Sequence, residues 1–278
     1  APSGPDGLPL IGNTIQYARD PCGFREKCAE KYGDVVYMDL LGMDTYMVTD
    51  PEEIKRVLIT ERDKFKKPDS SQRELGHIVG DGLLMSEGEL WKRQRQLMQP
   101  VFFGDKVEEY ESVMVQNTQR WMDRWEVGET YNIEHEMKDL TLRTLIESMF
   151  GTDIEYENRE IRSAVKELLK PAQPERLPLT FVFPKWVPLP MYRNSWNALE
   201  QIEDLIHEMI RRRREGENED RDDLLSILLR ARDEDGNQMS DKQLRDEMVT
   251  ILLAGHETSA SPVLFDPRGS PPRVSRTL

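Results

Sequence analysis

The chain has 278 residues, 37% of them hydrophobic, which is enough to bury the core of one large domain or two ordinary ones. A formal net charge of -14 argues against a general affinity for nucleic acid or anionic lipid. The charged fraction of 32% is also typical of halophilic, salt-adapted surfaces. No apolar run approaches the roughly 18 residues of a membrane-spanning helix, and the first residues do not form a signal peptide. We therefore expect a cytoplasmic protein without a transmembrane segment.

The first 60 residues combine irregular, helical and strand patterns. Proline and glycine in residues 1–14 predict an extended lead-in. A helix is expected over 24–32, then a β-hairpin with strands 35–40 and 45–48 around the turn Gly42-Met43-Asp44, and a helix over 51–60. The two cysteines, Cys22 and Cys28, are too few for a disulfide framework and wrongly spaced for zinc or redox chemistry, which fits a reducing cytoplasm.

Almost everything after residue 60 has helical periodicity. Ser86 and Glu89 form a capping box that opens a helix containing Trp91 and Arg95. A second box, Ser240 with Gln243, opens the last helix. Further helices are expected over 105–125, 133–150, 159–169, 194–214, 222–232 and 241–260. The fold class is therefore mainly α with a small N-terminal β-hairpin.

A proline-rich segment, residues 171–190, interrupts these helices and places aromatic side chains on a loop. It lines an entrance, touches a membrane surface, or simply folds back over the body. The sequence leaves these alternatives open.

Trp91 and Arg95 are the first pair with a chemical meaning. At a spacing of four they project from one helical face, where an indole N–H and a guanidinium can reach the same carboxylate. The alternative is a cation stacked on the neighbouring indole, and for the isolated pair this is the favoured interpretation.

The last helix contains the sequence LLAGHETSA, residues 252–260. Gly255 costs the helix about 1 kcal/mol relative to alanine, so it marks a place where another group approaches the backbone closely. Glu257 and Thr258 place an acid and an alcohol beside it, a combination that can pass protons or bend the helix. His256-Glu257 begins like a zinc-protease motif, but Ala260 stands where the second histidine would be.

Several motifs in one order resemble the cytochrome P450 family of haem-thiolate monooxygenases. The resemblance covers residues 1 to about 260 and implies a cytochrome P450 fold as far as the long distal helix. The motifs are LPLIGN at 8–13, YGDV at 32–35, GDGLL at 80–84, Trp91-x-x-x-Arg95, Pro100-x-Phe102 and Ala254-Gly255-His256-Glu257-Thr258.

The resemblance implies a role for each motif. Trp91 and Arg95 would hold a propionate of haem b, and Phe102 belongs to the same cofactor-binding set. Ala254 and Gly255 would make room for dioxygen, Glu257 and Thr258 would deliver protons, and Leu84 would face the substrate. The reaction would be hydroxylation of an apolar, fatty-acid-like substrate with electrons from a ferredoxin, flavodoxin or flavoprotein.

The sequence also departs from the family. The late loop with the cysteine that binds iron, and the Glu-x-x-Arg helix before it, do not follow residue 260, so no metal ligand is assigned. Residues 261–278 are rich in proline, arginine and serine, which predicts a disordered, non-homologous tail produced by a frameshift or premature end. The chain alone is then expected to be inactive, and the alternative function is a non-catalytic gene product or helical interaction module.

Overall fold

The computed structural model describes residues 2–68, 75–151, 159–169, 190–216 and 222–264. The chain forms two compact units, Ala1–Lys66 and Lys67–Leu278. The proline-rich segment 171–189 and the tail from residue 265 lie outside the described residues.

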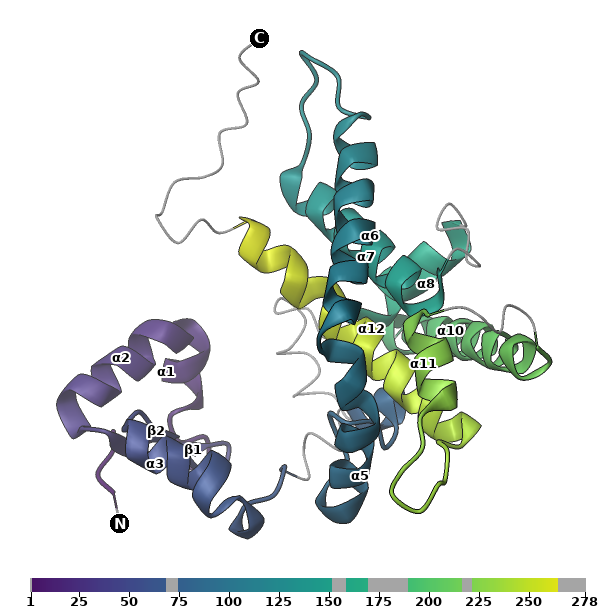
Figure 1. Ribbon diagram of the computed structural model, residues 1–278. Helices are drawn as coiled ribbons and strands as arrows, with labels where there is room; N and C mark the ends of the chain where they lie inside the picture. Colours follow the sequence, from purple (N-terminus) through teal and green to yellow (C-terminus); the bar gives the residue numbers. More distant parts are fainter. Residues whose placement is uncertain (1, 69–74, 152–158, 170–189, 217–221, 265–278) are drawn as a thin grey trace. The chain divides into compact units, whose positions relative to one another are not determined.

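The first unit is a hairpin with short helices (Figure 1). Its small core contains Cys28, Val36 and Met38, with Phe24, Tyr32 and Met47 packed against them. In chain order its elements are α1 Thr14–Arg19, α2 Pro21–Tyr32, β1 Val35–Leu40, β2 Met43–Val48, α3 Pro51–Lys55, a π-helical turn Arg56–Thr60 and a 3-10 turn Arg62–Lys64.

The hairpin is confirmed, but its predicted turn is wrong. Strands β1 and β2 pair antiparallel from Val35–Val48 to Leu40–Met43, which leaves only Leu41 and Gly42 in the turn. Both turn residues have positive φ, 56° and 78°, as a two-residue turn that follows the strand twist requires. Met43 and Asp44 therefore belong to the second strand.

Two helical boundaries near the N-terminus also differ from the prediction. Helix α1 was not expected, and α2 begins at Pro21 rather than at residue 24. The Asp20 carboxylate accepts the N–H of Gly23 at 3.0 Å, and proline suits the first turn of a helix. The cap and the proline together start α2 three residues early.

The second unit is helical (Figure 1). Helix α12 packs along α7 and also contacts α10, while α8 packs on α10 and α6 on α7. Leu142, Met149, Ile206, Leu225 and Met248 are among its buried core side chains. Its elements are α5 Gly88–Met98, a 3-10 turn Gln99–Phe102, α6 Asp105–Met122, α7 Ile133–Phe150, α8 Arg159–Leu169, α10 Pro190–Arg214, α11 Leu224–Arg230 and α12 Asp241–Leu264.

The predicted helices 133–150 and 159–169 are confirmed as α7 and α8. Three others have shifted ends: α6 stops at Met122, α10 starts at Pro190, and α11 is shortened to Leu224–Arg230. The last of these has a local cause, because Asp223 is the N-cap and accepts the N–H of Ser226 at 2.8 Å.

The capping box predicted for α5 is wrong. The helix begins at Gly88 with Glu87 as N-cap, and no side chain caps it. Lys67 holds this segment instead: its Nζ donates to the carbonyl of Ser86 at 2.7 Å, and its backbone N–H donates to the Glu87 carboxylate. A contact with a residue 19 positions away replaces the local cap.

The start of α12 agrees with the sequence prediction, and its end does not. The capping box at its start is confirmed, because Gln243 N–H donates to Ser240 Oγ at 3.2 Å and Ser240 N–H donates to Gln243 Oε1 at 3.0 Å. The predicted end at residue 260 is wrong, since the helix runs through Pro262 to Leu264. Proline has a helical φ and lies here in the last turn, so it removes one hydrogen bond without ending the helix at once. No helix among the described residues has the length and apolarity to cross a membrane.

Candidate functional site

The C-terminal half of α12 has one exposed face. Ala254 and Thr258 lie one turn apart on it, both exposed. The Thr258 hydroxyl donates to the carbonyl of Ala254, a bond that threonine commonly makes within a helix. The backbone of Glu257 belongs to the same helix, and its side chain lies outside the described residues. A small residue and a hydroxyl therefore occupy one accessible patch.

Gly255 lies on a different face, against α7. A Cβ at this position would stand 3.1 Å from Cδ2 of Leu145, a separation tighter than nine in ten real Cβ contacts. The prediction that a group approaches the backbone at Gly255 is confirmed, and that group is the Leu145 side chain. Space for dioxygen beside this glycine remains a prediction.

His256 is buried with 2% of its surface exposed. Thr141 of α7 donates its hydroxyl to the His256 carbonyl at 3.2 Å. Burial lowers the pKa of the imidazole to about 4, so it is neutral near pH 7. His256 fixes α12 to α7 and stays apart from the exposed patch of Ala254 and Thr258.

On α5, the Arg95 guanidinium stacks on the Trp91 indole, 5.2 Å from the ring centroid. The stacking favoured for the isolated pair is therefore present. Arg95 is exposed, and no carboxylate among the described residues pairs with it. Stacking leaves the in-plane N–H donors of a guanidinium available for a carboxylate, so both interpretations of the pair are compatible.

The opposite side of α5 is anchored to the region before α12. Arg93 donates to Asp233 at 2.6 Å and to the carbonyl of Gln238 at 3.1 Å. Arg93 is two residues from both Trp91 and Arg95, about 200° around the helix. The Trp91–Arg95 face is therefore turned away from this anchor.

A cavity of about 470 Å³ lies between α6, α7 and α12. Phe102, which is 53% exposed, contributes to its wall together with Gly255, so the structure brings these two predicted residues to one cavity. The other lining residues are Tyr110, Met114, Thr118, Leu140, Thr141, Thr144, Leu145, Ser148, Met149, Leu224, Ile251 and Ser259.

Leu84 lies in a tight turn that covers the first half of α12. Gly82 N–H donates to the Val79 carbonyl at 3.1 Å, and Met85 N–H donates to the Gly82 carbonyl at 2.8 Å. Leu84 remains 41% exposed whereas Met85 is buried. The predicted substrate-facing residue is thus presented on the surface of a turn with a fixed backbone.

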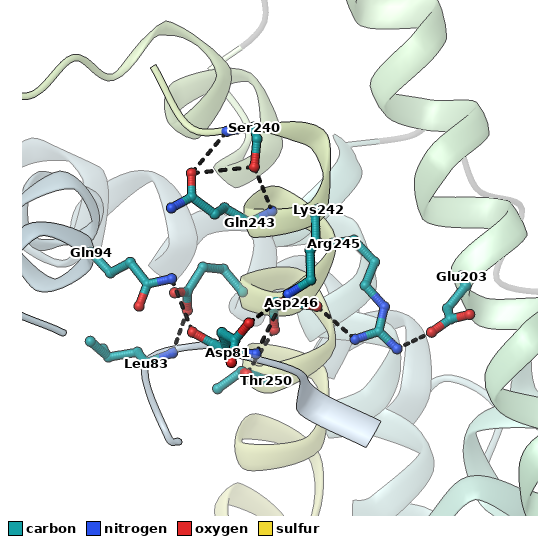
Figure 2. A network of polar contacts seen from close by, with 11 residues as sticks. Asp81, Leu83, Gln94, Glu203, Ser240, Lys242, Gln243, Arg245, Asp246 and Thr250 are labelled. Carbon is teal, nitrogen blue, oxygen red and sulfur yellow. Dashed lines mark hydrogen bonds and ion pairs between the residues drawn. The ribbon is translucent and has the colours of Figure 1, made fainter. Parts of the chain in front are cut away.

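Two adjacent carboxylates of α12 hold that turn (Figure 2). Asp81 N–H donates to Asp246 Oδ2 at 3.0 Å, and Leu83 N–H donates to Glu247 Oε2 at 3.0 Å. Lys242 bridges the carboxylates of Asp81 and Asp246 at 2.7 and 2.8 Å. Arg245 donates to Asp246 Oδ1 at 2.8 Å, so the buried charge of Asp246 is paired.

The glycines of this turn are required by its closeness to α12. A Cβ on Gly80 would lie 2.3 Å from Asp246 Oδ1, and one on Gly82 would lie 2.2 Å from Thr250 Oγ1. Gly80 also has a φ of +57°. The Gly-Asp-Gly sequence therefore reflects contact with residues more than 160 positions away.

Asp246, Glu247 and Lys67 were not predicted from the sequence. Lys67 Nζ donates to the Leu83 carbonyl at 3.2 Å, and burial lowers the pKa of this amine. A usable signal existed in the sequence: two neighbouring acids directly precede the apolar run of α12, where an unpaired charge would be costly. The partner turn could not be identified from the helix alone.

The cysteines lie in the first unit. Cys22 is exposed and Cys28 is buried in α2. Burial raises the pKa of the Cys28 thiol, which favours its protonated form rather than a thiolate. Within the described ranges, no three His, Cys, Asp or Glu side chains cluster as metal ligands would.

Comparison with known proteins confirms the resemblance found in the motifs. The family model described as Cytochrome P450 matches residues 2–265. Cyclooctatin synthase of Streptomyces melanosporofaciens is 31% identical over 259 residues, which cover 92% of this chain and 56% of that protein. Pentalenene oxygenase of Streptomyces avermitilis is 28% identical over 270 residues, which cover 94% of this chain and 57% of that protein.

Solved structures show the same fold at lower identity. A retinoic acid-bound cyanobacterial CYP120A1 matches with a TM-score of 0.74 at 20% identity, covering 95% of this chain and 58% of that one. A cytochrome P450DA heme domain matches with a TM-score of 0.77 at 22% identity and the same coverage. The chain thus spans a little over half the length of the proteins it matches.

Proposed function

From the premise that the chain belongs to the cytochrome P450 family, we propose that it forms the distal, substrate-facing part of a haem-dependent monooxygenase. The observation that carries this proposal is the exposed patch on α12, where Ala254 and the Thr258 hydroxyl lie one helical turn apart. In this assignment the whole protein hydroxylates an apolar substrate with dioxygen and reducing equivalents.

The residues present fit a haem with propionate groups, and we assign haem b. The Arg95 guanidinium is exposed, stacked on Trp91, and has no carboxylate partner among the described residues. It is therefore prepared for one propionate, with the Trp91 indole beside it. Phe102 supplies apolar surface in the same cofactor-binding set. When bound, haem supplies iron-centred activation of dioxygen.

The residues of α12 have separate tasks in this proposal. Ala254 has only a methyl side chain and Gly255 has none, so together they leave room beside the helix for dioxygen. Thr258 holds a hydroxyl proton that it can reorient away from the Ala254 carbonyl, and Glu257 is the acid that exchanges protons with solvent. Leu84 presents an apolar side chain to the substrate.

The relatives favour a hydrocarbon-rich substrate. They include proteins named cyclooctat-9-en-7-ol 5-monooxygenase and pentalenene oxygenase. We therefore place apolar ring compounds of this kind first and fatty-acid-like chains second. A ferredoxin, flavodoxin or flavoprotein is the proposed electron donor.

The proposal assigns the thiolate that binds iron to the whole protein rather than to Cys22 or Cys28. These cysteines belong to the first unit, and burial raises the pKa of the Cys28 thiol. This chain by itself is accordingly proposed to be inactive in oxidation. The alternative, a non-catalytic helical module, predicts no specific haem affinity.

Haem titration of the purified chain distinguishes the two. We expect saturable binding, followed by the Soret absorbance, that weakens about 10- to 100-fold in Arg95→Gln, because a charge-assisted hydrogen bond contributes about 1.5–3 kcal/mol. Arg120→Gln, at an exposed arginine of α6, is the matched control. Equal affinity in all three proteins would contradict the assignment of Arg95. Reduction under carbon monoxide should give no thiolate-type Soret band in this chain.

A further inference from the structure

Charged side chains hydrogen-bond to the turn of residues 80–86, which contains Leu84, from two sides. Glu247 accepts the N–H of Leu83 at 3.0 Å, and Lys67 Nζ donates to the carbonyls of Leu83 and Ser86 at 3.2 and 2.7 Å. Both peptide groups of Leu83 are therefore bound by side chains. Leu84 is the next residue, so its position depends on the hydrogen bonds that Glu247 and Lys67 make to Leu83.

Three buried polar atoms beside the turn have no hydrogen-bond partner among the described residues. They are Glu247 Oε1, Gln94 Oε1 and Ser86 Oγ. Glu247 and Gln94 are fully buried, and Ser86 is 5% exposed. Such atoms are costly unless a proton or an ordered water joins them.

The two orphan acceptors flank consecutive peptide groups. Gln94 Nε2 donates to the carbonyl of Asp81 at 3.0 Å (Figure 2). Glu247 accepts the N–H of Leu83. Neither oxygen accepts a hydrogen bond from the described residues. A proton on Oε1 of Glu247 would remove the need for a donor there, while Oε2 still accepts from Leu83.

We propose that Glu247 is a positioning residue for Leu84: its carboxyl group fixes the backbone of the turn by accepting the N–H of Leu83. The role of Leu84 as a substrate contact rests on the proposed function. The other charged groups that face Glu247 are Asp246 on its own helix and Lys67 from the segment before the turn, while α5 contributes the neutral Gln94. Burial raises the pKa of Glu247 to about 7, which places both forms near physiological pH.

The test measures the position of residue 84 without haem or substrate. Nitroxide labels on Leu84→Cys and Gln96→Cys, in a Cys22→Ser background, report the distance distribution between the turn and the exposed side of α5. We expect a narrow distribution at both pH 6 and pH 8, because the Leu83 N–H has an acceptor in either form of Glu247. Glu247→Ala should widen it at both pH values, and the isosteric Glu247→Gln should keep it narrow at both.

Glu203→Gln is the control, because Glu203 pairs with Arg245 and does not touch the turn. Equal widths in Glu247→Ala and its parent, or the same widening in Glu203→Gln, would overturn the proposal. If Glu247→Ala does not fold, Glu247→Leu, which keeps a similar volume but has no acceptor, should widen the distribution relative to Glu247→Gln.

A second arm uses the haem-loaded chain and pentalenene as the hydrocarbon probe. The apparent Kd should rise at least threefold in Glu247→Ala and return in Glu247→Gln, with haem affinity unchanged. An unchanged Kd despite a widened distance distribution would overturn the link to the substrate. Absence of haem binding in the parent chain would instead contradict the proposed function, and the distance measurement would stand apart from it.

Discussion

The two halves of α12 meet different surroundings. Between Lys242 and Thr250 the helix is covered by the turn of residues 80–86, and Lys242, Asp246 and Glu247 each hydrogen-bond to that turn. Between Ile251 and Ser259 it lines an apolar cavity with Ile251, Gly255 and Ser259, and it exposes Ala254 and Thr258. The first half is therefore fixed by its own contacts, while the second half keeps an exposed surface.

This difference explains why one helix contains both buried carboxylates and exposed small residues. Asp246 and Glu247 are buried, and the turn is drawn so close to them that Gly80 and Gly82 have no space for a side chain. Among the described residues nothing covers Ala254 and Thr258 in this way, and both are exposed. The anchored half holds the helix in place, so that the open half can present its hydroxyl and backbone at a defined position.

The largest effect should follow from removing the central charge of the anchored half. Asp246→Ala leaves the buried Arg245 without its 2.8 Å partner and frees the N–H of Asp81. Breaking a buried pair on one side costs about 3–5 kcal/mol, which urea unfolding can measure. Asp241→Ala, at the exposed start of the same helix, should cost no more than about 1 kcal/mol. Equal losses in the two variants would contradict the distinction.

Glu247 should make stability fall as pH rises. Burial raises its pKa from 4.5 to about 7, so between these values the unfolded chain ionises while the folded chain keeps its proton. Relative to Glu247→Gln, the parent should lose about 3 kcal/mol between pH 4 and pH 8, at 1.36 kcal/mol per pKa unit. The difference should persist in high salt, because desolvation rather than a surface pair causes the shift. A pH-independent difference would refute this.

His256, in the other half, should act with the opposite sign. Burial lowers its pKa from 6.5 to about 4, so the folded state resists protonation and stability falls as pH drops through this range. The parent should lose about 3 kcal/mol on acidification relative to His256→Gln. Since the windows of Glu247 and His256 overlap, the parent should show a nearly flat profile between pH 4.5 and 6.5, and each single variant should reveal one slope. Unfolding measured across pH in all three proteins checks this.

How much could be predicted from the sequence follows from the range of each interaction. The stacking of Arg95 on Trp91 and the Ser240–Gln243 box are contacts within one helical turn, and both were foreseen. The false cap at Ser86 and the missed Asp246 and Glu247 depend on partners 19 to 165 positions away. Periodicity indicates which face of a helix is buried, but it does not identify what covers that face.

The smallest effect should come from Gly255. An added methyl group would meet Leu145 Cδ2 at 3.1 Å, which costs about 1–3 kcal/mol by overpacking, while alanine returns about 1 kcal/mol of helix propensity. Gly255→Ala should therefore destabilise by about 1 kcal/mol. In a Leu145→Ala background, the same substitution should instead stabilise by up to about 1 kcal/mol, because the opposing methyl groups are gone. A double-mutant cycle measures this coupling. Additive effects would show that Leu145 is not what limits space at Gly255.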